Sequence, residues 1–406
     1  MNKLIVAGFA ALVADAFTAG APAIAQQVPD AKPVDAATPA ADAAAAPAAP
    51  ALLPSLAGPL SYAATPVNFD LGPLGKVYVN GVVSGIGRFQ DHAVPGDHSS
   101  FGDISNGQVI VQKVDGVFQF FVQAGIYSTP SLGVPYLRAS RNNESTFGPI
   151  PQAFIKIAPT SSFSIEVGKL PTLQGAEYTF TFENMNIDRG LLWNVENAVA
   201  KGVQANYTHG PLAFSLALND GYYSSKYSTL TGSVAYTINP ANVLSFVGSG
   251  NTKTTTKATF VTSPLLNNQQ LYDLIYTYTK GKWVVQPYVQ YTHVDALPFL
   301  GTTSSSTIGG AVLAKYSITP EISLPVRAEY ISSSGQSGGT GANFLYGTGS
   351  EAFSITVSPT YQYKIFFARA ELSYVKASNT TPGLVFGPAG NDRSQTRGVV
   401  EVGLMF

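Results

Sequence analysis

The chain of 406 residues contains no cysteine, and only 12% of its residues are charged. The absence of cysteine excludes disulfides and thiolate metal sites. A typical soluble domain carries about 25% charged residues, so the low charge is unusual for a protein that is surrounded by water. The formal net charge of −1 offers no basic surface for nucleic acid, and we expect no nucleic-acid partner.

Long hydrophobic runs are also missing. Beyond the N-terminus, no apolar stretch approaches the roughly 20 residues that a membrane-spanning helix needs. Nevertheless, 45% of the residues are hydrophobic, and the chain has 39 Gly, 21 Tyr and 23 Phe. These residues occur in short segments of alternating polarity, which is typical of strands in a lipid-embedded β-barrel. A closed barrel pairs every backbone N–H and C=O group within the protein, as the interior of a bilayer requires.

Residues 1–25 have the features of an export signal. Lys3 supplies a positive start, residues 4–14 are apolar, and Ala25 ends a small-x-small cleavage site before Gln26. Residues 26–60 are rich in Ala and Pro, which predicts a mobile, semi-extended periplasmic linker. A contact with the cell wall is the alternative role of this linker. We assign residues 61–406 to a transmembrane β-barrel.

The segment from Thr396 to Phe406 predicts the last strand. Side chains alternate across a strand, so one face is wholly apolar and comprises Val400, Val402, Leu404 and Phe406. The other face is mixed and comprises Arg397, Val399, Glu401, Gly403 and Met405. An edge strand of a soluble protein would also alternate. The terminal Phe, however, resembles the closing strand and assembly signal of Gram-negative outer-membrane β-barrels, and this implies that Phe406 contacts the barrel-assembly machinery.

From Lys76 onward, segments of about ten residues are joined alternately by short turns and long polar connections. This rhythm predicts an all-β, antiparallel, up-and-down transmembrane barrel of about sixteen strands, with short periplasmic turns and long extracellular loops. At this size the lumen of a barrel is an aqueous channel. The expected strands are residues 76–88, 106–113, 117–127, 150–158, 162–170, 200–208, 212–219, 229–238, 243–250, 269–279, 282–293, 305–318, 321–332, 350–362, 365–376 and 396–406.

A soluble β-sandwich is the competing fold. Its apolar faces would pair with each other, whereas those of a membrane barrel face lipid. Trp283 and Tyr291 share one face of a single strand. Eight residues of strand span roughly 26 Å, close to the distance between the two aromatic girdles of a barrel, and this favours the membrane fold.

Two segments resemble a known family. Residues 183–197, continuing into Gly202–Tyr207, and residues Val122–Tyr127 look like the OmpL-like β-barrel porin family of outer-membrane proteins. The resemblance covers roughly residues 70–406 and implies a barrel and a channel. It implies no particular substrate and no set of binding residues.

The longest outer connection, residues 171–199, is expected to narrow the lumen, by analogy with the third loop of general porins. It contains Glu177, Glu183, Asp188, Arg189 and Glu196. Strand parity places five cations on lumen faces: Arg88, Lys156, Arg327, Arg369 and Arg397. Acids and bases that face each other across a constriction would create a transverse field. Alternatively, each arginine forms a local pair, as Arg327 with Glu329 or Arg369 with Glu371. The loop aromatics Tyr178, Phe180, Phe182 and Trp193 either pack the loop onto the wall or form a slide for sugars.

Signals of catalysis or cofactor binding are weak. The histidines His92, His98, His209 and His293 have neither HExxH spacing nor a G-x-S-x-G neighbour. His92 and His98, with Asp91 and Asp97, could at most form a weak metal site. We therefore expect no enzyme activity, no cofactor and no bound metal.

The expected function is a bacterial outer-membrane porin for passive diffusion of small hydrophilic solutes and ions. The expected partners are outer-membrane lipid, the assembly machinery and, by analogy with general porins, two further copies in a homotrimer. The alternative is a non-conducting barrel that serves as a surface scaffold or adhesin, with residues 128–149, 333–348 and 377–395 as contact loops.

Overall fold

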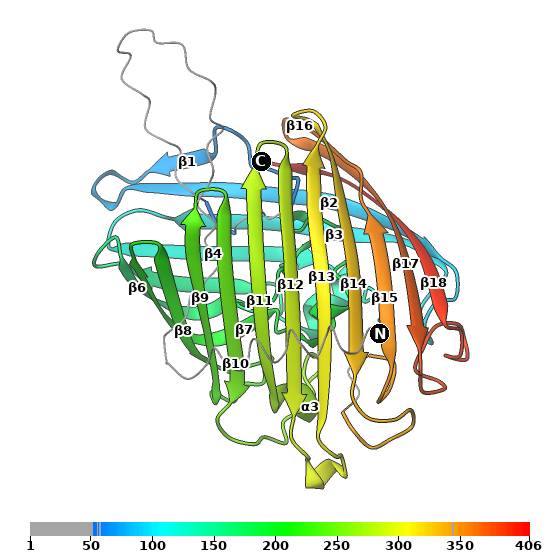
Figure 1. Cartoon of the computed structure of the whole chain (residues 1–406). Coiled ribbons are helices and arrows are strands. Elements are labelled where there is room, and N and C mark those ends of the chain that lie inside the picture. The colour runs from blue at the N-terminus through cyan, green and yellow to red at the C-terminus, as the bar shows by residue number, and fades with distance from the viewer. Residues whose placement is uncertain (1–51, 55, 57, 343–344) are drawn as a thin grey trace.

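A computed structural model describes residues 52–54, 56, 58–342 and 345–406. The expected signal peptide and most of the expected linker lie outside the described residues. The described chain forms one antiparallel sheet that closes on itself, because the last strand, β18 (Ser394–Met405), pairs with β2 (Lys76–Gln90). Figure 1 shows this barrel with its short turns at the upper end and the loop that carries α3 (Pro264–Asn267) at the lower end.

The wall has the sixteen strands that the sequence predicts. The labels β15 and β16 mark two halves of one wall strand, since both pair with β14 and β17. The break lies at Pro359, which has no N–H to donate to the ladder. The remaining wall strands are β3 (Ser100–Lys113), β4 (Phe118–Tyr127), β5 (Gln152–Ile157), β6 (Phe163–Pro171), β7 (Val199–His209), β8 (Leu212–Asn219), β9 (Thr229–Asn239), β10 (Asn242–Asn251), β11 (Gln269–Lys280), β12 (Trp283–Val294), β13 (Ser305–Ser317), β14 (Ile322–Ser333), β15 (Glu351–Val357), β16 (Thr360–Tyr363) and β17 (Phe366–Ser378).

Two details differ from the expected strands. β3 begins at Ser100, six residues before the expected start, because Phe101 and its neighbours pair with the extended end of β2. A short strand, β1 (Val67–Asp70), pairs with the start of β2 on the other edge. It is followed by the 3-10 helix η1 (Gly72–Leu74). The sequence pattern gave no sign of β1, since four residues are too few to display alternation.

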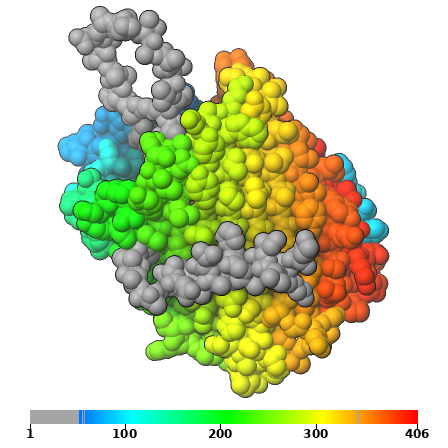
Figure 2. Space-filling model, viewed as in Figure 1, coloured from blue at the N-terminus to red at the C-terminus, as the bar shows by residue number. Residues whose placement is uncertain are grey.

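The expected side-chain alternation is present on the wall. On β14, Ile322, Leu324 and Val326 are exposed on the outside, whereas Ser323, Arg327 and Glu329 are buried inside. On β18, Val400, Val402 and Leu404 point outward and Glu401 inward. Trp283 and Tyr291 are also exposed on the outer face, as expected. Figure 2 shows β9–β15, green to orange, as one convex wall. The apolar faces therefore cover the outside of a single closed sheet, and a β-sandwich is excluded.

The short helices of the described chain lie in its connections. They include α2 (Ala139–Ser145), α3, and the 3-10 helices η2 (Thr181–Glu183), η3 (Leu192–Val195) and η4 (Pro298–Leu300). Across the described ranges, no helix has the length and apolar character needed to cross a membrane.

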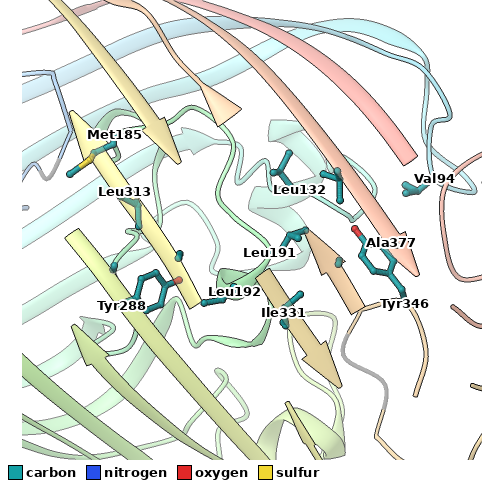
Figure 3. Packing of buried hydrophobic residues seen from close by; sticks show 14 of the residues in the cluster. Val94, Leu132, Met185, Leu191, Leu192, Tyr288, Leu313, Ile331, Tyr346 and Ala377 are labelled. Atoms are coloured by element: carbon teal, nitrogen blue, oxygen red, sulfur yellow. The ribbon is translucent and has the colours of Figure 1, made fainter. Parts of the chain in front are cut away.

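The connection between β6 and β7, residues 172–198, folds into the barrel; we call it the inner loop. Leu191 and Leu192 are fully buried and pack against inward-facing Tyr288 and Ile331 of the wall. Figure 3 shows these contacts. An aqueous lumen would have water along all inward faces, and this expectation is wrong along β11–β14. Inward positions of β11–β14 carry large apolar side chains, and the inner loop covers them as a core would.

Candidate functional site

Buried ion pairs fasten the inner loop to the wall. Arg327 on β14 donates from Nη1 to Glu177 at 2.6 Å and to the carbonyl of Asp188 at 2.8 Å. Its Nε donates to Glu329 at 3.1 Å. All of these side chains are nearly inaccessible to solvent. Arg327 thus makes both the contact with the loop and the local pair that the sequence left open.

A second arginine, Arg397 on β18, holds the next part of the inner loop. Its Nη1 donates to Asp188 at 2.7 Å and to the carbonyl of Ser131, in the connection before β5, at 2.9 Å. Arg88 on β2 pairs with Asp97 of the first long connection and lies 4.6 Å from the ring centroid of Phe101. Arginines on the lumen face therefore contact three long connections: the first one, the one before β5 and the inner loop.

Arg369 on β17 binds backbone instead of a loop carboxylate. It donates to the carbonyls of Thr181, Asn184 and Met185 at 2.9, 3.0 and 2.7 Å, and it pairs with Glu401 at 3.5 Å. The local pair of Arg369 with Glu371 is not formed. Glu371 accepts from the N–H groups of Ile187 and Asp188 at 2.6 and 3.1 Å.

These contacts differ from the transverse field that the sequence suggested, in which acids and bases face each other across water. The loop carboxylates Glu177 and Asp188 do face Arg327 and Arg397, but they touch them. No layer of solvent separates the two sets, because both are buried. The cations thus clamp the inner loop to the wall over β14–β18.

Three charged residues of the inner loop have no charged partner in contact within the described chain. Glu183 accepts a hydrogen bond from the N–H of Phe180 at 3.1 Å, and burial raises its pKa to about 8. Glu196 accepts from Gln290 at 2.8 Å, and burial raises its pKa well above the usual value. The guanidinium of Arg189 lies 4.8 Å from the ring centroid of Trp193, and burial lowers its pKa to about 10.

The inner-loop aromatics pack mainly among themselves and against the wall. Phe180 stacks on Phe182 with ring centroids 6.1 Å apart and meets Tyr127 edge-on at 5.1 Å. Both phenylalanines are fully buried. This arrangement favours the packing interpretation over a sugar slide. Tyr178 differs, because it borders a cavity.

A cavity of about 760 Å³ lies between the inner loop and β4–β8. Its wall combines polar and apolar side chains, with apolar atoms covering the larger part. Lys156 pairs with Glu166 at 3.3 Å, and Gln204 donates to Asn206 at 2.8 Å. Of the five predicted lumen cations, Lys156 is the one that borders this cavity, and Glu183 borders it from the loop side.

A second, much smaller hollow lies next to the cavity, toward the long-loop end. This hollow of about 10 Å³ shares Pro171, Leu173 and Gln204 with the cavity, and is closed by Asn197 and Asn219. That volume is about one water molecule. The two ends of the inner loop, at Leu173 and Asn197, border this smaller hollow.

One group of contacts was missed by the sequence analysis. Described residues of 52–62, which we call the strap, lie at the short-turn end of the lumen. Leu53 exchanges two hydrogen bonds with Gln112, and Leu60 is only 3% exposed. These residues differ from the mobile linker expected up to residue 60. Their signal was the appearance of Leu53, Leu56 and Leu60 after an Ala/Pro tract.

The suggested histidine–aspartate site does not assemble. Asp97 is engaged by Arg88, and His92 contacts the carbonyl of Ser394 at 2.9 Å. Across residues 58–342 and 345–406, together with the few earlier described positions, no group of three His, Asp or Glu residues could hold a metal ion.

Comparison with solved structures shows the same fold. OmpT of Vibrio cholerae, folded in vitro, superposes with a TM-score of 0.56 at 13% identity, covering 82% of this chain and 98% of that chain. The outer membrane channel DcaP of Acinetobacter baumannii has a TM-score of 0.53 at 10% identity, covering 81% and 97%. No curated protein sequence matches the chain.

The family comparison is more specific. The model of the family described as "Putative beta-barrel porin-2, OmpL-like" matches residues 76–406, which is the whole wall from β2 to β18. This match agrees with the resemblance of residues 122–127 and 183–197. The chain therefore belongs to this OmpL-like family of β-barrel porins, whose place is the bacterial outer membrane.

Proposed function

We propose that the barrel is a passive diffusion porin for small hydrophilic solutes and ions. The observation that carries the proposal is the division of the lumen. The inner loop is fastened over β14–β18 by Arg327, Arg397 and Arg369, whereas a cavity that Lys156 and Glu166 border stays open along β4–β8. Solutes would cross through this cavity, and the ends of the inner loop at Leu173 and Asn197 would set the size limit.

The proposed passage requires no chemical step. A solute exchanges its water shell for the amides, hydroxyls and the Lys156–Glu166 pair of the cavity wall, and moves down its gradient. The buried arginines act as supports for the loop. We propose no catalytic role for any residue.

Planar-bilayer recording tests the proposal. Stable ohmic steps from the purified protein would support it, and a barrel that never conducts would refute it. Deleting residues 177–196 should raise the conductance, because the loop no longer fills the lumen. Unchanged conductance would remove the inner loop from the constriction. Liposome swelling with graded sugars, amino acids and anions would then give the size limit and charge preference.

A surface scaffold is the second candidate. It is favoured by the filling of the lumen, where Leu191 and Leu192 of the inner loop and Leu60 of the strap are buried. In that case the barrel displays its long connections, and the deletion of 177–196 opens a lumen that is normally shut. A silent full-length protein with a conducting deletion variant would identify this function.

Export by residues 1–25, recognition of Phe406 by the assembly machinery, and trimer formation are further parts of the proposal. Phe406 exchanges two backbone hydrogen bonds with Gly81, both of 3.0 Å, so the terminal residue is integrated into the seam of the wall. Mass measurement in micelles tests the trimer, and N-terminal sequencing tests cleavage before Gln26.

A further inference from the structure

Two wall glutamines bind the backbone of the strap in the same way. Gln112 on β3 accepts from the N–H of Leu53 at 2.9 Å and donates to its carbonyl at 2.8 Å. Gln362 on β16 accepts from the N–H of Ser61 at 2.9 Å and donates to its carbonyl at 2.8 Å. A side-chain amide that makes both bonds to one residue recognises extended backbone as a neighbouring strand would.

The middle of the strap rests on the inner loop. The N–H of Gly58 donates to the carbonyl of Glu183 at 3.2 Å, and Lys315 on β13 donates to the carbonyl of Gly58 at 3.2 Å. A Cβ atom on Gly58 would lie 2.2 Å from the carbonyl oxygen of Asn184. Only glycine fits at this position without displacement of the backbone.

The side chains of the strap cover an apolar part of the lumen. Leu60 is buried, and Leu53, Leu56 and Tyr62 pack against the same cluster. The wall side of this cluster includes Val82, Ile110, Phe121, Phe154, Phe367 and Met405. These are inward-facing positions, where an open aqueous pore gains nothing from large apolar side chains. A segment that covers them accounts for their presence.

The strap itself matches this surface. Residues 52–62 contain no charged side chain. Leucines occur at 52, 53, 56 and 60, and the backbone groups of residues 53, 58 and 61 face Gln112, Lys315 and Gln362. The pattern is therefore that of a ligand recognised through its main chain, with leucine side chains supplying buried area.

We propose that the short-turn end of the lumen is a binding site for an extended, uncharged, leucine-containing peptide. The strap occupies this site as a tethered ligand and plugs the mouth of the barrel. Leu53 and Pro54 border the cavity along β4–β8, so release of the strap widens the proposed route. The plug part of the inference rests on the porin function, whereas the peptide site does not.

Peptide binding to the full-length protein tests the site. In the Gly58→Val variant the strap is displaced, so a labelled synthetic peptide with the sequence of residues 52–62 should bind in detergent micelles and saturate, as measured by fluorescence anisotropy. The unaltered protein should bind at least tenfold more weakly, because its own strap competes at a high effective concentration. A peptide carrying the same Gly58→Val change is the matched control and should not bind.

A second variant with an unoccupied site keeps the test valid if the Gly58→Val protein misfolds. We call these two variants the vacant forms. Deletion of residues 52–62 lies upstream of all wall strands, and its folding is checked by circular dichroism. It should bind the peptide as the Gly58→Val variant does. Replacing both Gln112 and Gln362 by Ala in this form should weaken binding at least tenfold. Gln119→Ala is the control, since Gln119 borders the cavity but donates to Gly116. Absence of saturable binding, or equal binding of both peptides, would overturn the proposed site.

Conductance then tests the plug. The vacant forms should have a higher single-channel conductance than the unaltered protein, and the peptide added from the short-turn side should reduce it to the original value. If the peptide binds but conductance does not respond, the plug is refuted. If the peptide binds and no form conducts, the porin function fails while the peptide site stands.

Discussion

Arg327 and Glu177 lie 150 residues apart in the chain, yet their side chains meet at 2.6 Å in the interior of the barrel. The contact joins β14 to the inner loop across the lumen. Neither side chain reaches solvent, so the pair is a buried link between the wall and the inner loop, as is the pair of Arg397 with Asp188. Loss of the Arg327–Glu177 pair should therefore weaken the attachment of the inner loop to the wall.

Replacing Arg327 by Met should destabilise this link strongly. The carboxylates of Glu177 and Glu329 would be left buried without their cation, and breaking a buried pair costs about 3–5 kcal/mol. We expect a lower free energy of unfolding in urea and a noisier, larger single-channel conductance. The double variant with Glu177→Gln should regain part of the loss. Lys156→Met, which breaks a pair within the wall, is the control and should not increase the noise of the single-channel conductance.

Glu183 predicts a pH dependence of stability. Its pKa in the folded protein is raised to about 8, above the value of about 4.3 in an unfolded chain. The folded state therefore holds a proton that the unfolded state releases. Stability from this group is complete below about pH 4.3 and falls as pH rises toward 8, since the unfolded state binds fewer protons in that window.

Urea unfolding between pH 4 and 9 measures this effect. In Glu183→Gln the decline should be smaller over the same window, because the neutral amide has no proton to lose. Glu144→Gln removes an exposed carboxylate that pairs with Arg141 and serves as control. Equal slopes in the original protein and the Glu183 variant would contradict the prediction.

Lys156 should influence ion selectivity. It borders the cavity beside Glu166, so its removal leaves an uncompensated carboxylate along the proposed route. Lys156→Ala should shift the reversal potential in a KCl gradient toward cation preference. Lys226→Ala, which changes an exposed lysine of a long connection, should have little effect. If the reversal potential is the same in all three proteins, ions do not pass along β4–β8.

Phe406 should affect assembly more than a comparable aromatic does. Phe406→Ala removes the terminal ring at the seam with β2, while Phe366→Ala removes a ring with similar exposure from β17. We expect a several-fold lower amount of heat-modifiable, folded barrel in outer membranes for Phe406→Ala only. Equal losses would mean that the ring contributes area alone and no signal.

The wall could be predicted from the sequence because strand periodicity is local. Ile322, Leu324 and Val326 reveal their face within five residues, and such segments joined by alternating short turns and long loops are typical of an up-and-down barrel. Pro359 was read as part of one strand, and the two halves on either side of it do occupy one place in the wall.

The site was predicted only in part. The inner loop and its carboxylates were identified from length and charge, but their contact partners were not, since Asp188 and Arg397 are 209 residues apart. The apolar filling of the lumen was missed because Leu191 and Ile331 belong to segments with no shared pattern. The strap was missed because Gln112 and Gln362 recognise backbone, which leaves little trace in side-chain composition.

The pairing of β2 with β18, which closes the wall, bears on when the strap can dock during folding. The strap precedes β2 in the chain and lies within the ring that β18 completes. Gln112 lies on β3 and Gln362 on β16, on opposite sides of the junction between β2 and β18. The strap is therefore held in its full set of contacts only in a barrel whose wall has closed, so docking of the strap should report completion of the wall.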